Sequence, residues 1–111
     1  MISTHVLDTA RGRPAAGIAV RLEQAGPGSG SHYTLIGEGT TDADGRVGEL
    51  VPDGAAIAAG RYRLRFDTAA YLGEDAFFPQ VAIAFAVTRP DEHHHVPLLL
   101  SPYGYTTYRG S

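Results

Sequence analysis

Residues 93–111 of the chain read HHHVPLLLSPYGYTTYRGS. The pattern predicts two strands, at residues 95–100 and 105–109. A chain end is normally frayed and polar, yet an aromatic, a cation and a hydroxyl side chain occupy the last four residues here. We therefore expect this end to be held in place for chemistry. A further histidine, His5, lies at the other end of the sequence, and we predict that the two ends meet in space.

Composition narrows the class of protein. The 111 residues are enough for one domain with a core, covering 1–111, and too few for two. A net charge of −3 gives no sign of a nucleic-acid or anionic-membrane partner. The absence of cysteine excludes disulfides, thiolate metal sites and cysteine nucleophiles. Neither a signal peptide nor an apolar run of roughly 20 residues is visible, so we expect a cytoplasmic protein.

Glycine and proline punctuate the remaining sequence, and the segments between them favour strands. Besides the two C-terminal strands, we predict strands at residues 4–10, 17–23, 33–40, 60–66 and 81–87. About seven or eight short strands with regular turns predict an all-β protein, a two-sheet β-sandwich.

Three connections carry their own signals. Residues 42–45, Asp-Ala-Asp-Gly, predict a turn with Gly45 in a left-handed conformation. The glycine-serine segment 26–31 predicts a flexible loop. One short helix is expected within residues 68–73, capped by Thr68 and ended by Gly73.

Alternation along a strand decides which side chains leave the core. In strand 95–100, one face carries Val96, Leu98 and Leu100, and the other carries His95, Pro97 and Leu99. If the first face fills the sandwich, His95 points outward, and the same parity places His5 on an outward face. The outward apolar side chains would then be Leu7, Pro97, Leu99 and Tyr108. Because such a face is too apolar to remain in water, we expect a second subunit to cover it, with the histidines in the resulting groove.

Several motifs together resemble one family. They are Thr-His-Val-Leu-Asp at 4–8, Gly-Arg-Pro-Ala at 12–15, Thr-Asp-Ala-Asp-Gly-Arg at 41–46 and the tail from His95 to Ser111. These segments resemble the transthyretin-related proteins, the 5-hydroxyisourate hydrolases, over essentially the full chain. The terminal Tyr-Arg-Gly-Ser is the specific part, because it separates the hydrolases from the hormone carrier transthyretin. One departure is His94, where the family commonly has an aromatic residue.

The resemblance implies a transthyretin-like sandwich that assembles as a homotetramer, a dimer of dimers with active sites at the dimer–dimer interface. It also implies hydrolysis of 5-hydroxyisourate to 2-oxo-4-hydroxy-4-carboxy-5-ureidoimidazoline in urate degradation, without a cofactor. The catalytic residues carried over by motif position are His5, Arg46, His95 and Ser111. Tyr108, Arg109 and Gly110 are the expected substrate-binding residues.

These residue types suit that chemistry. A neutral imidazole activates water near neutral pH, and a permanently charged, forked guanidinium suits a ring with several carbonyl oxygens. Gly110 leaves room for a close backbone approach, Tyr108 offers an aromatic wall and Arg109 could pair with a carboxylate. Ser111 brings a hydroxyl and a terminal carboxylate. Which histidine is the base stays open.

Other interpretations remain to be weighed. His93 and His95 share a strand face and could hold a metal ion, with His5 as the third ligand. The hydrolysis does not require a metal ion, so we expect none. Alternatively, the chain is a transthyretin-type carrier of small ligands without catalysis, although acid–base residues argue against this. A sandwich-type adhesive module is a third class, which would normally be secreted.

Overall fold

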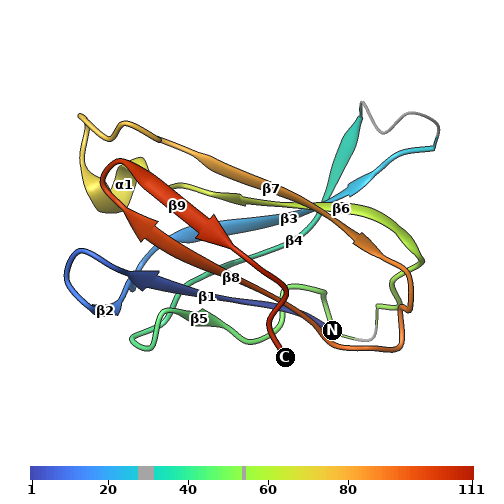
Figure 1. The fold of residues 1–111 in the computed structure, drawn as a ribbon. Helices are drawn as coiled ribbons and strands as arrows, with labels where there is room; N and C mark the ends of the chain where they lie inside the picture. The colour runs from blue at the N-terminus through green and yellow to red at the C-terminus, as the bar shows by residue number, and fades with distance from the viewer. Residues whose placement is uncertain (28–31, 54) are drawn as a thin grey trace.

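Two β-sheets face each other in the computed structural model, with a single turn of helix at one end (Figure 1). The structure describes residues 1–27, 32–53 and 55–111. Most of the loop expected at 26–31 lies outside the described residues. No helix in the described segments is long and apolar enough to cross a membrane.

The first sheet contains both ends of the chain. Its strands are β1 (Ile2–Asp8), β2 (Arg13–Pro14), β5 (Arg46–Val47), β8 (His94–Ser101) and β9 (Gly104–Thr107). Their order is β2-β1-β8-β9, with β5 pairing β1. β1 and β8 are parallel over seven residue pairs, from Ile2 opposite His94 to Asp8 opposite Leu100. The first and last long segments of the sequence therefore lie side by side, as predicted (Figure 1).

The second sheet is antiparallel throughout. It contains β3 (Ala19–Ala25), β4 (Tyr33–Thr40), β6 (Gly60–Phe66) and β7 (Val81–Val87), in the order β4-β3-β6-β7. In β6, alternation buries Tyr62, Leu64 and Phe66, while the arginines between them face out. The apolar faces of both sheets meet in one core.

The sequence-based elements are largely confirmed. The seven strands of four or more residues are the predicted ones, and β4, β6 and β7 have the predicted bounds. The two-residue strands β2 and β5 were not predicted, because two residues carry no periodicity. β9 ends at Thr107 instead of 109, since only the bridge between His95 and Gly110 continues the pairing.

The helix α1 (Ala69–Leu72) lies inside the predicted segment, but its start differs from the expectation. Thr68 makes no side-chain cap. Its hydroxyl instead donates to the carbonyl of Phe78 at 2.5 Å. Gly73 ends the helix at φ 106°, as predicted.

The outward face of the first sheet is less apolar than predicted. Pro97 is buried within the chain, because Gly110 packs against its ring and the Thr107 hydroxyl bonds its carbonyl oxygen at 2.8 Å. Leu7 and Leu99, which are register partners, are half-buried, and Tyr108 is exposed.

Asp8 connects helix α1 to the end of β1 through hydrogen bonds. Its carboxylate accepts backbone N–H bonds from Ala10 and Arg11, both at 3.0 Å, and the Tyr71 hydroxyl at 2.7 Å. Burial alone raises the pKa of Asp8, but the Tyr71 bond and the two backbone bonds outweigh it, so the pKa lies below 3.8.

Asp8→Ala should lower the free energy of unfolding by at least about 2 kcal/mol, because it leaves a half-buried hydroxyl and two amides without their acceptor. Since the native pKa is lowered, the contribution of Asp8 is complete above pH 3.8 and is lost as the pH falls through the native value. Urea titrations at pH 7 measure the change. Asp91→Ala, at an exposed carboxylate, is the control, and equal stability of the two variants would contradict the assignment.

Candidate functional site

Parallel pairing of β1 with β8 places a serine between two histidines. Ser3 is the register partner of His95. The Ser3 hydroxyl lies 2.8 Å from Nδ1 of His95 and 2.6 Å from Nε2 of His93, so one buried hydroxyl connects both rings. The rings themselves lie 6.1 Å apart between centroids.

Arg46 reaches the same face from the other side of β1. The carboxylate of Asp42 accepts N–H bonds from Asp44 at 2.9 Å and Arg46 at 3.0 Å, which forms the predicted turn. Gly45 sits in this turn at φ 75°, a conformation that favours glycine. Arg46 follows this turn as the first residue of β5, and its register partner in β1 is His5.

The C-terminal segment closes the site. The Gly110 N–H donates to the His95 carbonyl oxygen at 2.8 Å. A Cβ atom at Gly110 would lie 2.5 Å from Cδ2 of His95, so only glycine fits against the ring at this distance. Ser111 follows directly and reaches the rim of the site.

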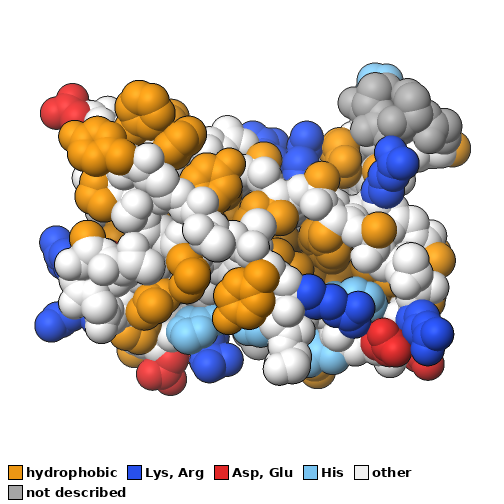
Figure 2. All heavy atoms as spheres, viewed as in Figure 1, with side chains coloured by type: hydrophobic (Ala, Val, Ile, Leu, Met, Phe, Trp, Pro, Cys, Tyr) orange, Lys and Arg blue, Asp and Glu red, His pale blue; other side chains and the backbone are white. Residues whose placement is uncertain are grey.

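These elements enclose a shallow cavity of about 190 Å³. Its lining residues are Ser3, Thr4, Arg46, Val47, Gly48, His93, His95 and Ser111. Figure 2 shows histidine side chains gathered on the lower half of this face, with arginines nearby. Three of the four predicted catalytic residues thus line one cavity.

The environment of His95 favours its neutral form. Partial burial is the main cause that lowers its pKa below 6.5, and the nearby positive charge of Arg46 adds to it, as do His93 and His5. A neutral imidazole beside a fixed cation can accept a proton near neutral pH.

The remaining predicted residues lie around this cavity. His5 neighbours Arg46 in the pairing of β1 with β5 but does not line the cavity. Tyr108 and Arg109 line an adjacent apolar cleft of about 260 Å³ along β7. Arg109 does pair with a carboxylate, Glu92, at 3.3 Å, as its charge predicted.

His94 points the opposite way from its two histidine neighbours. It is buried on the core side of β8, and its Nδ1 atom has no hydrogen-bond partner in the described part of the chain. It therefore takes no part in the cavity of His93 and His95. Within the described ranges, no three histidine or carboxylate side chains are grouped so as to hold a metal ion.

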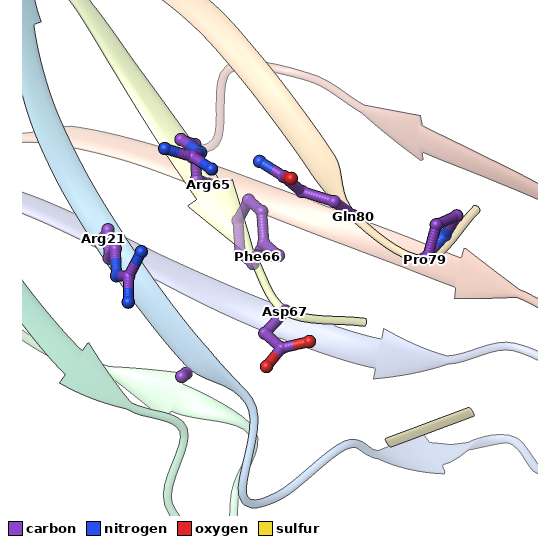
Figure 3. Close-up of a pocket in the computed structure, with 7 residues that line it drawn as sticks. Arg21, Arg65, Phe66, Asp67, Pro79 and Gln80 are labelled. Carbon is purple, nitrogen blue, oxygen red and sulfur yellow. The ribbon is translucent and has the colours of Figure 1, made fainter. Parts of the chain in front are cut away.

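Another hollow lies on the outer face of the second sheet. It has about 180 Å³ and contains Arg21, Arg65, Asp67 and Gln80 (Figure 3). The Arg65 guanidinium donates to Glu23 at 3.2 Å, and a Gln80 amide turned with its oxygen toward Arg65 accepts from Nε at 2.6 Å. Because Arg65 is already paired and no histidine lines this hollow, the histidine cavity is the better candidate for acid–base chemistry.

The sequence analysis missed Ser3 and considered His93 only as a possible metal ligand. Strand parity places Ser3 on the same face as His5, and that signal was available. The partner of Ser3 was not, because the register between two strands 90 residues apart cannot be read from either strand.

Comparison with known proteins identifies the family. A family model described as the HIUase/Transthyretin family matches residues 2–110. The chain belongs to this family. The two-sheet sandwich expected from the resemblance is therefore confirmed.

Two relatives illustrate the range within the family. The chain is 48% identical over 120 residues to the uric acid degradation bifunctional protein TTL of Arabidopsis thaliana, covering 99% of this chain and 37% of that protein. It is 46% identical over 114 residues to the 5-hydroxyisourate hydrolase of Salmonella dublin, covering 100% of this chain and 81% of that protein. The chain thus spans little more than a third of the plant relative and most of the bacterial one.

Similar solved structures include both a 5-hydroxyisourate hydrolase and a transthyretin bound to thyroxine. The 5-hydroxyisourate hydrolase of Klebsiella pneumoniae superposes with a TM-score of 0.82 at 34% identity, covering 99% of this chain and 98% of that one. Sea bream transthyretin in complex with thyroxine superposes with a TM-score of 0.84 at 32% identity, covering 98% and 93%. The backbone alone therefore does not separate the hydrolase from the thyroxine-bound transthyretin.

Arg46→Ala should raise the pKa of His95 toward 6.5, because it removes the cation beside the ring while leaving the burial of the ring in place. An NMR pH titration of the His95 ring measures the shift. Arg61→Ala, at an exposed arginine of the other sheet, is the matched control. An unchanged or lower His95 pKa in Arg46→Ala would show that Arg46 does not act on this ring.

Proposed function

We propose that this chain hydrolyses 5-hydroxyisourate to 2-oxo-4-hydroxy-4-carboxy-5-ureidoimidazoline in urate degradation. The observation that carries the proposal is the cavity in which the His95 ring, held neutral, lies with Arg46 and Ser111. Identity of 46% to the Salmonella dublin hydrolase over the whole chain supports the same substrate. Residues 1–111 form one hydrolase domain in this proposal.

The reaction needs an activated water and a place for developing negative charge. In our mechanism, Nε2 of His95 takes a proton from water as the water oxygen bonds to a ring carbonyl carbon of the substrate. The Arg46 guanidinium stabilises the oxyanion that forms. The carbon–nitrogen bond of the ring then breaks, and the proton held by His95 passes to the leaving nitrogen. The products are an N–H group and a carboxylic acid, which releases its remaining proton to solvent and becomes a carboxylate.

We assign the other residues supporting roles. His5, beside Arg46, binds and orients substrate oxygens at the edge of the cavity, and Ser111 does so from the opposite rim. Gly110 keeps the C-terminal segment close to the His95 ring. Tyr108 and Arg109 contact substrate only if the adjacent cleft joins the cavity in the assembled protein. No metal or cofactor has a necessary step.

His5→Ala, Arg46→Ala and His95→Ala should each lower the hydrolysis rate by about 10²- to 10⁴-fold, because each removes a group acting on the substrate or water. The losses should not multiply in a double variant, since the residues act on one transition state. Ultraviolet decay of freshly made 5-hydroxyisourate, with and without protein, measures the rate.

Two controls accompany this assay. Arg61→Ala removes an arginine far from the cavity and should leave the rate unchanged. Wild-type protein with a chelator should keep its rate; loss restored by zinc would move the assignment to a metal site. Near-normal turnover of His95→Ala would remove His95 from the mechanism.

A second candidate function is a carrier of small ligands, which the close superposition with sea bream transthyretin favours. A carrier would bind thyroxine, measured by calorimetry, and leave the decay of 5-hydroxyisourate unchanged. The histidine-arginine cavity is our reason for ranking hydrolysis first. A cytoplasmic location stays a prediction, which cell fractionation tests.

We also propose that the chain forms a homotetramer, a dimer of dimers. Half-buried Leu7 and Leu99 lie side by side on the outer face of the first sheet, next to the histidine site. Covering this pair with a second dimer would remove apolar surface from water and would also enclose the shallow cavity.

Leu99→Glu should convert the tetramer to dimers and abolish most hydrolysis, because a carboxylate would be buried in the interface. Light scattering at micromolar concentration measures the mass. Leu35→Glu, at an exposed leucine of β4, is the control and should keep both mass and rate. A wild-type monomer, or a tetrameric Leu99→Glu, would refute this arrangement.

A further inference from the structure

The hydroxyl of Ser3 has one hydrogen and two imidazole neighbours. It can donate to one ring nitrogen only, so the other ring must donate its own N–H to the oxygen. Either His95 carries its proton on Nδ1 and Ser3 donates to His93, or Ser3 donates to His95 and leaves the proton of that ring on Nε2. These two arrangements differ in which nitrogen of His95 can accept a proton.

We propose that Ser3 and His93 are positioning residues that hold His95 as its Nδ1–H tautomer, with the Nε2 lone pair directed to the cavity. The chain of bonds runs from His95 Nδ1–H to the Ser3 oxygen, and from the Ser3 hydroxyl to Nε2 of His93. This inference rests on the proposed function, in which His95 Nε2 takes a proton from water.

Charge in the cavity favours this direction. Arg46 lines the same cavity as His95 and acts electrostatically on its ring. A positive guanidinium attracts a lone pair and repels an N–H dipole, so it favours an unprotonated Nε2 on the cavity side.

The surroundings keep the three groups in place. Ser3 is buried and held opposite His95 by the parallel ladder. Gly110 packs against the Cδ2 edge of the His95 ring, and its N–H donates to the His95 carbonyl oxygen at 2.8 Å. His93 is exposed, and its contribution is the acceptor that engages the Ser3 hydrogen. Without this acceptor, the hydroxyl is free to donate to His95 and stabilise the unproductive tautomer.

The same series of hydrogen bonds also suits the protonated form of His95. When His95 holds the proton taken from water, both of its nitrogens are donors, and the Nδ1–H bond to Ser3 strengthens because the donor is charged. No heavy atom has to move during the transfer. A ring already oriented before reaction lowers the reorganisation that catalysis requires.

Two-bond ¹H–¹⁵N NMR spectra of the full chain at pH 7.5 report directly which nitrogen of His95 is protonated, without substrate. The His95 signals are assigned by their loss in His95→Asn. We expect the Nδ1–H tautomer in the wild type and a large Nε2–H population in Ser3→Ala and His93→Leu. His93→Leu alters an exposed residue, so it tests the proposal even if Ser3→Ala folds poorly.

Kinetics supply the second readout. Ser3→Ala and His93→Leu should lower kcat by about 10- to 100-fold with little change in KM, because a positioning partner is lost while the residues assigned to substrate, His5, Arg46 and Ser111, are kept. Ser3→Thr, which keeps the hydroxyl, and His93→Gln, which keeps an acceptor, should recover most of kcat. Ser101→Ala removes a hydroxyl distant from the cavity and should change neither readout.

The outcomes separate this inference from the proposed function. An Nε2–H tautomer in the wild type, or no change of tautomer in either variant, overturns the relay whether or not the chain hydrolyses 5-hydroxyisourate. A changed tautomer with unchanged kcat overturns the positioning role. If the chain proves inactive but its tautomer responds as expected, the relay stands and the proposed function fails.

Discussion

The parallel pairing of β1 with β8 is the constraint on which the rest of the molecule depends. Parallel neighbours need a long crossover connection, and here that connection contains the whole second sheet. The pairing therefore joins two segments that are separated by most of the chain. Because the histidine cavity is built along this ladder, the site exists only where the first and last long segments of the chain lie side by side (Figure 1).

The cavity is made by three kinds of contact that meet on one face of the ladder. Alternation turns Ser3 and His95 away from the core, the Asp42 turn delivers Arg46, and Gly110 closes the space against the ring. Partial burial and a fixed cation keep the imidazole neutral. The residue types of the cavity are those of a solvent-exposed surface. Its electrostatics differ from those of such a surface, because the backbone holds each polar group at a fixed position.

Local patterns predicted the strands well because each strand buries one face against a single core. The bounds of Tyr33–Thr40 and Gly60–Phe66 follow from alternation bounded by glycine and proline. Two expectations failed for a common reason. The Thr68 side chain makes no cap bond, and Pro97 is buried, because another segment supplies the partner. That partner is the Phe78 carbonyl for Thr68 and the C-terminal residues for Pro97.

The sequence by itself determined the class of fold, the outward direction of His5 and His95, and, through its motifs, the family. Period-two alternation and motif spacing are properties of contiguous residues, so they can be read locally. Only the tertiary structure decided that Ser3 connects His93 with His95, and that Tyr108 lines a separate cleft. Register between strands far apart in the chain is set by hydrogen bonding and packing across the sheet, and neither strand contains that information alone.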